Sequence, residues 1–309
     1  MRTLPLTVVV LAAVISHAAA QLSVEIITDQ EQFLRDESIQ LKVRVTNRSG
    51  QTLRLGTDND WLSFNVDSHE GVAITKLGDV PVRGEFLLES AHVATRLVDL
   101  APSFDLTEPG RYVVTATVRV KDWASEISSK PKRIEVVRGT KIWEQEFGIP
   151  VPSGFPEVRR YILQQAQYQK QLRLYLRIAD ANDQTVFKVQ PLGTLVSFSR
   201  PEAQVDQNSD LNVIFQNGAR SFSFLVVRPD GNITLRQTYD YTSTRPSLRA
   251  NDEGRIYVSG GVRRYTAGDI PTPLPPPTNV VDAVITNIPA APTNTPAERG
   301  KSDGKSRKK

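Results

Sequence analysis

Acidic and amide side chains at the spacing D-x-N-x-D are the residues of this sequence most suited to holding a metal ion. Asp206, Asn208 and Asp210 stand at that spacing, which would place three oxygen ligands on one side of a turn. However, Leu211 occupies the position where a calcium loop requires glycine, and Asn217 occupies the position of its final glutamate. Because Asp and Asn are also common turn residues, we favour a turn and expect no bound metal or other cofactor.

Histidine and cysteine limit the catalytic chemistry open to the chain. His69 and His92 are the histidines outside the first 20 residues, and Asp67 and Ser68 precede His69 directly. Neighbouring residues in a loop or strand point apart, and no G-x-S-x-G motif is present, so a Ser-His-Asp triad is disfavoured. The sequence has no cysteine, which excludes thiol nucleophiles, disulfides and Cys-ligated metals. We therefore expect a protein that is not an enzyme.

Arginine and tyrosine are concentrated towards the end of the second half of the chain. Such side chains suit recognition of sugars, acidic glycans or a protein by stacking and by forked hydrogen bonds. The alternative, which we favour, is that tyrosines pack between strands while the arginines pair with Asp240, Asp252 and Glu253. The candidate partner-binding residues are Arg236, Tyr239, Tyr241, Arg245, Arg263, Arg264 and Tyr265.

Alternation between apolar and polar residues predicts strands in the first half of the chain. Apolar side chains at every second position of residues 39–45 alternate with polar ones, and the turn-forming run 47–50 follows. The same period-two pattern runs through residues 112–120. Short strands with one buried side, separated by turn signals, are typical of an antiparallel sandwich.

The turn before residues 112–120 carries a resemblance to a known family. Leu106-Thr107-Glu108-Pro109-Gly110-Arg111-Tyr112 resembles the turn before the penultimate strand of immunoglobulin-like domains, where a tyrosine hydroxyl caps the preceding loop. Residues 21–138 as a whole are similar to immunoglobulin-like modules of secreted bacterial proteins. The resemblance implies a β-sandwich that spaces, presents or binds. Residues 139–160, which are rich in aromatic residues and proline, are expected to form an extended connector packed along one of the bodies.

The second half of the chain contains an internal repeat of about 40 residues. The matching segments are 171–176 with 210–215, 186–195 with 224–233, and 207–213 with 252–258. Residues 166–262 resemble the β-propeller repeats of secreted bacterial proteins. Two and a fraction units are fewer than the roughly four blades of the smallest propellers. We therefore expect residues 161–268 to form a small antiparallel domain of blade-like hairpins or, less favoured, part of a ring assembled from several copies.

The beginning of the chain has the pattern of an export signal. Arg2 precedes an apolar run over residues 4–15, and the small residues Ala18-Ala19-Ala20 suit cleavage before Gln21. The apolar run is shorter than the roughly 20 residues that span a bilayer. Residues 1–20 are thus predicted to be a signal peptide, and no transmembrane segment is expected after its removal. The predicted location is secreted, periplasmic or on the cell surface.

The end of the chain differs from both bodies in composition. Residues 269–309 are rich in proline, poor in bulky apolar residues and end in Lys and Arg, so a disordered tail is predicted. The formal net charge is +4, but residues 298–309 alone hold six basic and two acidic side chains. The rest of the mature chain is about neutral, and we expect no nucleic-acid binding by the folded bodies.

Together these patterns predict an exported, all-β, non-enzymatic protein that binds or scaffolds at the bacterial cell envelope. Its expected partners are a protein or glycan of the envelope, or further copies of itself as a homo-oligomer. Two alternatives stay open. One is a secreted carbohydrate-active enzyme or its carbohydrate-binding accessory module, and the other is a structural subunit of a surface assembly.

Overall fold

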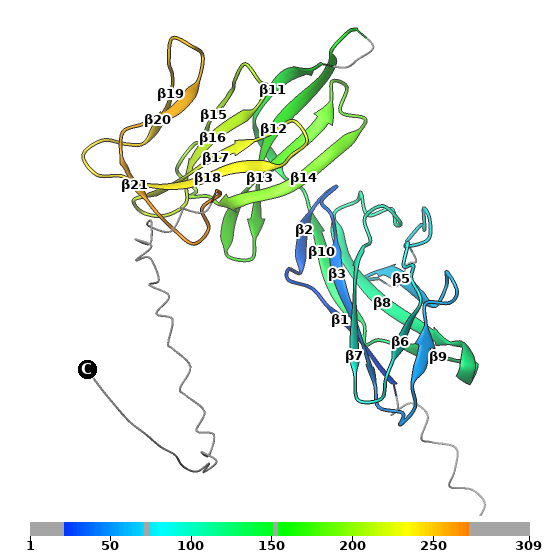
Figure 1. Cartoon of the computed structure of the whole chain (residues 1–309). Helices are drawn as coiled ribbons and strands as arrows, with labels where there is room; N and C mark the ends of the chain where they lie inside the picture. The colour runs from blue at the N-terminus through cyan, green and yellow to red at the C-terminus, as the bar shows by residue number, and fades with distance from the viewer. Residues whose placement is uncertain (1–21, 71–73, 151–153, 272–309) are drawn as a thin grey trace, which may run out of the picture. The chain divides into compact units, whose positions relative to one another are not determined.

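The computed structural model describes residues 22–70, 74–150 and 154–271 (Figure 1). The predicted signal peptide and residues 272–309 of the predicted tail lie outside the described residues. The predicted start of the tail at residue 269 is wrong, because Asp269 is buried and Ile270 forms a β-bridge with Arg236. The described residues belong to one of the two units into which internal contacts divide the chain, Met1–Thr272. They form strands, turns and one short 3-10 turn at Lys121–Trp123, with no α-helix among them. The all-β prediction is confirmed, and no helix in the described ranges is long and apolar enough to cross a membrane.

The first body contains the strands up to β10. They are β1 (Leu22–Ile27), β2 (Gln32–Leu34), β3 (Gln40–Asn47), β4 (Leu53–Leu55), β5 (Leu62–Ser68), β6 (Phe86–Leu88), β7 (Val93–Asp99), β8 (Gly110–Val120), β9 (Ser125–Ser128) and β10 (Lys132–Val137). One sheet has the order β1-β3-β7 and a second has the order β2-β10-β8-β5, with β9 beside β8; β4 and β6 form a separate pair. All these pairs are antiparallel except β2 with β10. Apart from β8 with β9, no two strands paired in this body are consecutive in the sequence.

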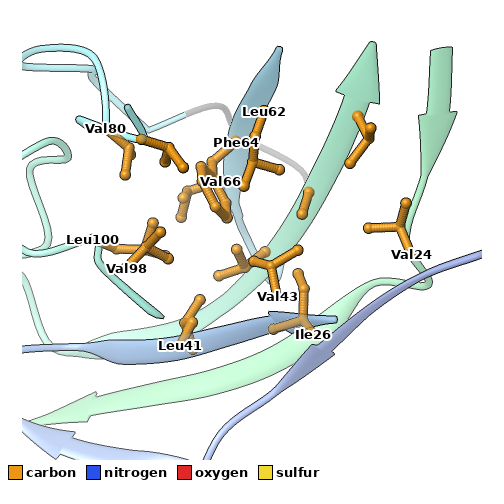
Figure 2. Packing of buried hydrophobic residues seen from close by; sticks show 14 of the residues in the cluster. Val24, Ile26, Leu41, Val43, Leu62, Phe64, Val66, Val80, Val98 and Leu100 are labelled. Atoms are coloured by element: carbon orange, nitrogen blue, oxygen red, sulfur yellow. The ribbon is translucent and has the colours of Figure 1, made fainter. Parts of the chain in front are cut away.

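The two larger sheets of the first body bury a single apolar core between them. Alternate residues of β1 and β3, such as Ile26 and Val43, contribute to the same cluster as Phe64 and Val66 of β5 (Figure 2). The alternation predicted for residues 39–45 and 112–120 is confirmed, because β3 and β8 bury every second side chain. Apolar and polar residues alternate along these strands because one face of each sheet packs on the core and the other faces solvent.

The second body contains β11 to β21. They are β11 (Thr140–Ile149), β12 (Glu157–Tyr168), β13 (Gln171–Asp180), β14 (Val186–Thr194), β15 (Glu202–Val205), β16 (Leu211–Gln216), β17 (Ser221–Val227), β18 (Ile233–Asp240), β19 (Ser247–Ala250), β20 (Ile256–Ser259) and β21 (Val262–Arg264). Two antiparallel sheets follow the chain order, β11-β12-β13-β14 and β15-β16-β17-β18, and β21 is added to the end of the second. Each sheet is thus a meander of four consecutive strands.

Two apolar clusters hold the second body together. One face of each meander contributes to a shared core that includes Leu163, Leu176, Val213 and Leu225. The β19–β20 hairpin contributes Leu248 to a separate cluster on the second meander. Because the second meander packs on both faces, β16 is buried along its first five residues instead of alternating.

The residues expected to form a connector, 139–160, are extended but belong to a sheet. β11 and the start of β12 pair with each other across this range, so the chain connection between the bodies is just Arg138 and Gly139, between β10 and β11. Pro156 does not start a helix, because Glu157–Tyr168 is strand β12. Backbone pairing with β13 along the whole of β12 explains why the strand prevails over the proline signal.

The repeated Pro-x-Gly segments do not have the same structure. Pro229-Asp230-Gly231 forms the turn between β17 and β18, with Gly231 at φ +85. Pro191-Leu192-Gly193 instead lies within β14, where Leu174 and Tyr175 of β13 pair with Gly193 and Pro191. Leu192 is the extra residue of this bulge and is buried in the core. The two matching segments of the repeat therefore differ in backbone structure.

Candidate functional site

The D-x-N-x-D residues form the turn between β15 and β16. One carboxylate oxygen of Asp206 accepts hydrogen bonds from the backbone N–H groups of Asn208, at 2.9 Å, and Asp210, at 3.0 Å. The other oxygen accepts a bond from Asn212 Nδ2 at 3.3 Å. Burial and the charge of Asp206 raise the pKa of Asp210. Asp206 thus stabilises its own turn, and within the described ranges no three or more His, Asp or Glu side chains are grouped to hold a metal.

The same turn is attached to the core of the second body by two hydrogen bonds. The hydroxyl of Tyr161, which is fully buried, donates to the carbonyl of Ser209 at 2.9 Å. The hydroxyl of Ser209 donates in turn to the carbonyl of Gly148 at 2.8 Å. The ring of Tyr161 stacks on Phe147 with centroids 3.9 Å apart. Because burial raises the pKa of Tyr161, its hydroxyl stays protonated and can donate this bond.

The two histidines lie on exposed parts of the first body. His92, in the turn before β7, has Nδ1 3.1 Å from the carbonyl oxygen of Ser90. His69 follows β5, and its backbone N–H donates to the carbonyl of Arg111 at 2.8 Å. The carboxylate of Asp67 accepts a hydrogen bond from Asn65 at 2.7 Å. These contacts belong to turns and strand ends.

A hollow of about 280 Å³ lies beside His69, and the sequence analysis did not anticipate it. Its lining residues are Glu31, Gln32, His69, Arg111, Tyr112, Arg133, Ile134, Glu135 and Gln169. Arg111 and Glu135 stand opposite each other in the β8–β10 ladder, so charges of opposite sign face each other across the strands. The mixed charge selects neither an anion nor a cation, which makes the hollow a weaker candidate than the arginine and tyrosine residues of the second body.

Two of the predicted partner-binding arginines make structural contacts. Arg236 of β18 is half-buried, and its Nη1 donates to the carbonyl of Leu192, at the end of the other meander, at 3.1 Å. Arg264 pairs with Asp240 at 3.0 Å and donates to the hydroxyl of Ser221 at 3.0 Å. Arg264 with Asp240 is one of the pairings that the sequence suggested. These arginines connect strands of the second body.

Arg263 connects the last strand to the turn that follows it. Its guanidinium pairs with the buried carboxylate of Asp269 at 2.8 Å and lies 5.9 Å from the ring centroid of Tyr239 and 4.9 Å from that of Tyr265. Although burial acts in the opposite direction, hydrogen bonds from Thr266 and Arg263 hold the pKa of Asp269 below its usual value. The carboxylate therefore stays charged, and its ion pair holds Arg263 near both tyrosine rings.

Exposed apolar side chains lie around β21 at the end of the second meander, and we call this region the β21 surface. Its exposed side chains are Tyr241 (41%), Val262 (56%), Tyr265 (69%) and Ile270 (41%). Arg220, which the sequence analysis missed, lies with its guanidinium 5.8 Å from the ring centroid of Tyr241. Arg245 lies over Phe222 at 5.4 Å. Of the seven predicted residues, Tyr241, Arg245, Arg264 and Tyr265 are exposed to solvent, although Arg264 pairs with Asp240.

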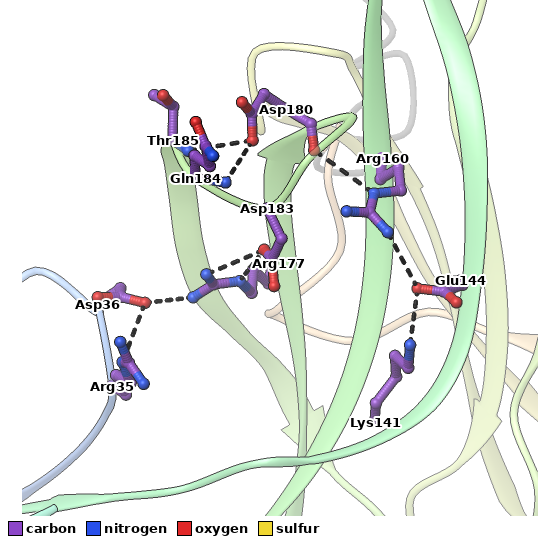
Figure 3. Close-up of polar contacts among 10 residues, drawn as sticks. All are labelled: Arg35, Asp36, Lys141, Glu144, Arg160, Arg177, Asp180, Asp183, Gln184 and Thr185. Atoms are coloured by element: carbon purple, nitrogen blue, oxygen red, sulfur yellow. Dashed lines mark hydrogen bonds and ion pairs between the residues drawn. The ribbon is translucent and has the colours of Figure 1, made fainter. Parts of the chain in front are cut away.

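An ion pair and an apolar cluster connect residues of the two bodies. Arg177 of β13 binds Asp36 of the first body and, at 3.1 Å, Asp183 of the following turn (Figure 3). Leu34 of β2 belongs to an apolar cluster with Tyr175 and Val189. No local pattern could have revealed the pairing, because Asp36 and Arg177 are 141 residues apart.

Comparisons with known proteins leave the family open. No protein-family model matches the chain, and no curated protein sequence matches it. Among solved structures, the sporulation control protein Spo0M from Bacillus subtilis is similar, with 10% sequence identity and a TM-score of 0.29. The similarity covers 51% of this chain and 79% of the Spo0M chain. A TM-score of this size carries no argument about fold or function.

Proposed function

We propose that this chain is an exported, non-enzymatic binding or scaffolding protein of the bacterial cell envelope. In this proposal the first body is an immunoglobulin-like sandwich, supported by the two facing sheets and by the hydrogen bond from the Tyr112 hydroxyl to the carbonyl of Glu108. The second body consists of two blade-like meanders, supported by their consecutive four-strand order. Export is supported by the leader pattern of residues 1–20.

The exposed side chains of the β21 surface are the main support for the proposed binding function. Tyr241, Val262, Tyr265 and Ile270 all expose apolar surface around β21, where Arg263 and Arg264 are held in ion pairs. Arg263 is held beside Tyr265 by a buried carboxylate, so part of the surface is ordered before any partner binds. Tyrosine rings next to guanidinium groups offer stacking and hydrogen bonding to a sugar ring or to a protein segment.

The proposed partner is a glycan or a protein of the envelope, and binding assays can separate the two. We would measure retention of residues 21–309 on purified cell-wall polysaccharide and, separately, on envelope protein immobilised after removal of polysaccharide. Tyr265→Ala is expected to weaken binding to one of these materials by about tenfold, as removal of a central aromatic side chain does. Phe198→Ala is the matched control, because Phe198 is an exposed aromatic residue (82%) outside the β21 surface.

The outcomes of this assay distinguish the proposal from its alternatives. Loss on polysaccharide alone identifies a glycan ligand, and loss on protein alone identifies a protein partner. Equal retention of both variants and wild type would contradict a role for the β21 surface. Hydrolysis of the polysaccharide by the wild-type protein would contradict the non-enzymatic proposal and support the carbohydrate-active alternative.

A further inference from the structure

The edge strand β7 exposes apolar side chains on the first body. Among the described residues its only ladder partner is β3, so the other long side of β7 has no strand beside it. The side chains of Val93 and Leu97 are 53% and 64% exposed, and Thr95 between them is exposed as well. An edge strand of this kind, with apolar residues on its outer face, is able to pair with another strand.

The hydrogen bonds of the β3–β7 ladder show which backbone groups of β7 are open. At its two ends, Asn47 N donates to the carbonyl of His92 at 3.0 Å and Leu100 N donates to that of Ile39 at 3.1 Å. Residues that bond the neighbouring strand alternate along an antiparallel ladder with residues whose groups point away. The residues of β7 whose N–H and C=O groups point to the open edge are Val93, Thr95, Leu97 and Asp99. Three of these four also carry the exposed side chains.

We propose that β7 pairs antiparallel with β7 of a second copy of this chain, with Thr95 at the two-fold axis. In this register Val93 of each copy stands opposite Leu97 of the other, and the two Thr95 residues face each other. Each of these three residues donates and accepts one backbone hydrogen bond across the interface. The strand is therefore complementary to itself, as a symmetric dimer requires.

The neighbouring register is disfavoured by charge. A two-fold axis at Arg96 would place two Arg96 residues opposite each other and would set Val93 against Asp99. With the axis at Thr95, Arg96 instead faces the small Ala94 of the second copy. Arg96 is already held by its own body, because its guanidinium lies 4.3 Å from the ring centroid of Phe86 and donates to the carbonyl of Gly84 at 3.3 Å. The charge on this inner face is thus compatible with a dimer.

The contact is small, which sets its expected strength. Two paired edge strands bury less surface than the roughly 1,200–2,000 Å² of a stable, specific interface. The dimer should therefore form reversibly and depend on protein concentration. The dimer does not involve the β21 surface. The proposal of a dimer can therefore be tested independently of the proposed binding function.

Light scattering after size exclusion tests the pairing on residues 21–309 over a wide range of concentration. The wild-type protein should shift from monomer to dimer, and Leu97→Lys should raise the dimer dissociation constant by about tenfold or more, since the substitution acts twice in a symmetric interface. Phe198→Lys, which adds the same charge at an exposed apolar residue of the second body, should leave the dimer unchanged. A monomer at every concentration, or a dimer that Leu97→Lys leaves intact, overturns the proposal.

A second variant tests the register without weakening the strand. The sequence has no cysteine, so Thr95→Cys introduces the single thiol of the protein. A short thiol cross-linker should join two copies at low protein concentration, because facing residues of an antiparallel pair lie about 5.5 Å apart. Thr117→Cys, on β8 of the same body, is the control and should stay monomeric. Equal cross-linking of both variants would contradict the proposed pairing.

Discussion

Both bodies bury an apolar core between two sheets, but their strand orders differ. In the first, neighbouring strands come from distant parts of the chain, as in the order β2-β10-β8-β5. In the second, β11 to β14 and β15 to β18 are neighbours in chain order. A fold rich in local pairs loses less loop entropy before its contacts form. Folding of the first body therefore depends more on contacts between distant parts of the chain than folding of the second.

The two bodies also treat their sheet edges differently. The last strand of the second meander, β21, carries Arg263 and Arg264 in ion pairs with Asp269 and Asp240. The edge strand β7 of the first body instead presents apolar side chains to solvent. Charged, paired residues discourage strand addition, whereas an apolar edge permits it. In our proposals the second body therefore binds the ligand, and the first body associates with a second copy through β7.

The largest expected effect comes from removing a core side chain from either body. Leu41→Ala and Leu225→Ala each remove a fully buried leucine, and each should lower the free energy of unfolding by about 2–5 kcal/mol. Hydrogen exchange followed by mass spectrometry should show lost protection in the altered body, with a smaller change in the other. Equal loss of protection in both bodies would mean that they unfold as one unit.

A smaller effect is expected from the tyrosine hydroxyl that each body uses to hold a turn. Tyr161→Phe removes a fully buried donor to Ser209 and should cost about 1–3 kcal/mol, because the carbonyl is left without its partner. Tyr112→Phe removes the donor to Glu108 at a more accessible turn and should cost about 1 kcal/mol. Urea unfolding measures both. Tyr257→Phe, on an exposed tyrosine, is the control, and a larger loss for Tyr112→Phe would reverse the comparison.

The smallest effect is a dependence of stability on pH that has opposite sign for two carboxyl groups, Glu37 of the first body and Asp269 of the second. Burial raises the pKa of Glu37 above its usual value, against hydrogen bonds from Leu34 N–H and Gln30. Its contribution to stability is therefore present below the pKa of the unfolded chain and is lost as pH rises through the folded pKa. The pKa of Asp269 is lowered, so its contribution is present above the unfolded pKa and is lost as pH falls through the folded one.

Substitution of either acid should remove its share of this pH dependence. Between pH 3 and pH 7, Glu37→Gln should flatten the loss of thermal stability on the alkaline side in the first body. Asp269→Asn should flatten the loss on the acidic side in the second body. Thermal unfolding followed by hydrogen exchange at each pH separates the two. The same slope change from both variants would contradict the opposite signs.

Sequence reasoning was most successful where the signal is local. The alternation in β3 and β8 predicted which side chains are buried, because one strand with one covered face already imposes that pattern. It failed over residues 139–160, where proline and aromatic residues concealed β11 and the start of β12. Of the candidate surface residues, Tyr265 is exposed while Arg263 is paired with Asp269, a difference that depends on one turn.

The sequence by itself determined that the described chain is all-β, that half of each strand in β3 and β8 is buried, and that no thiol chemistry is available. Only the tertiary structure decided which arginines are paired, that Arg177 reaches Asp36, and that β7 keeps an open edge. The physical reason is distance along the chain. Periodicity acts between residues that are neighbours in sequence, whereas ion pairs and free sheet edges depend on strands that the fold brings together or keeps apart.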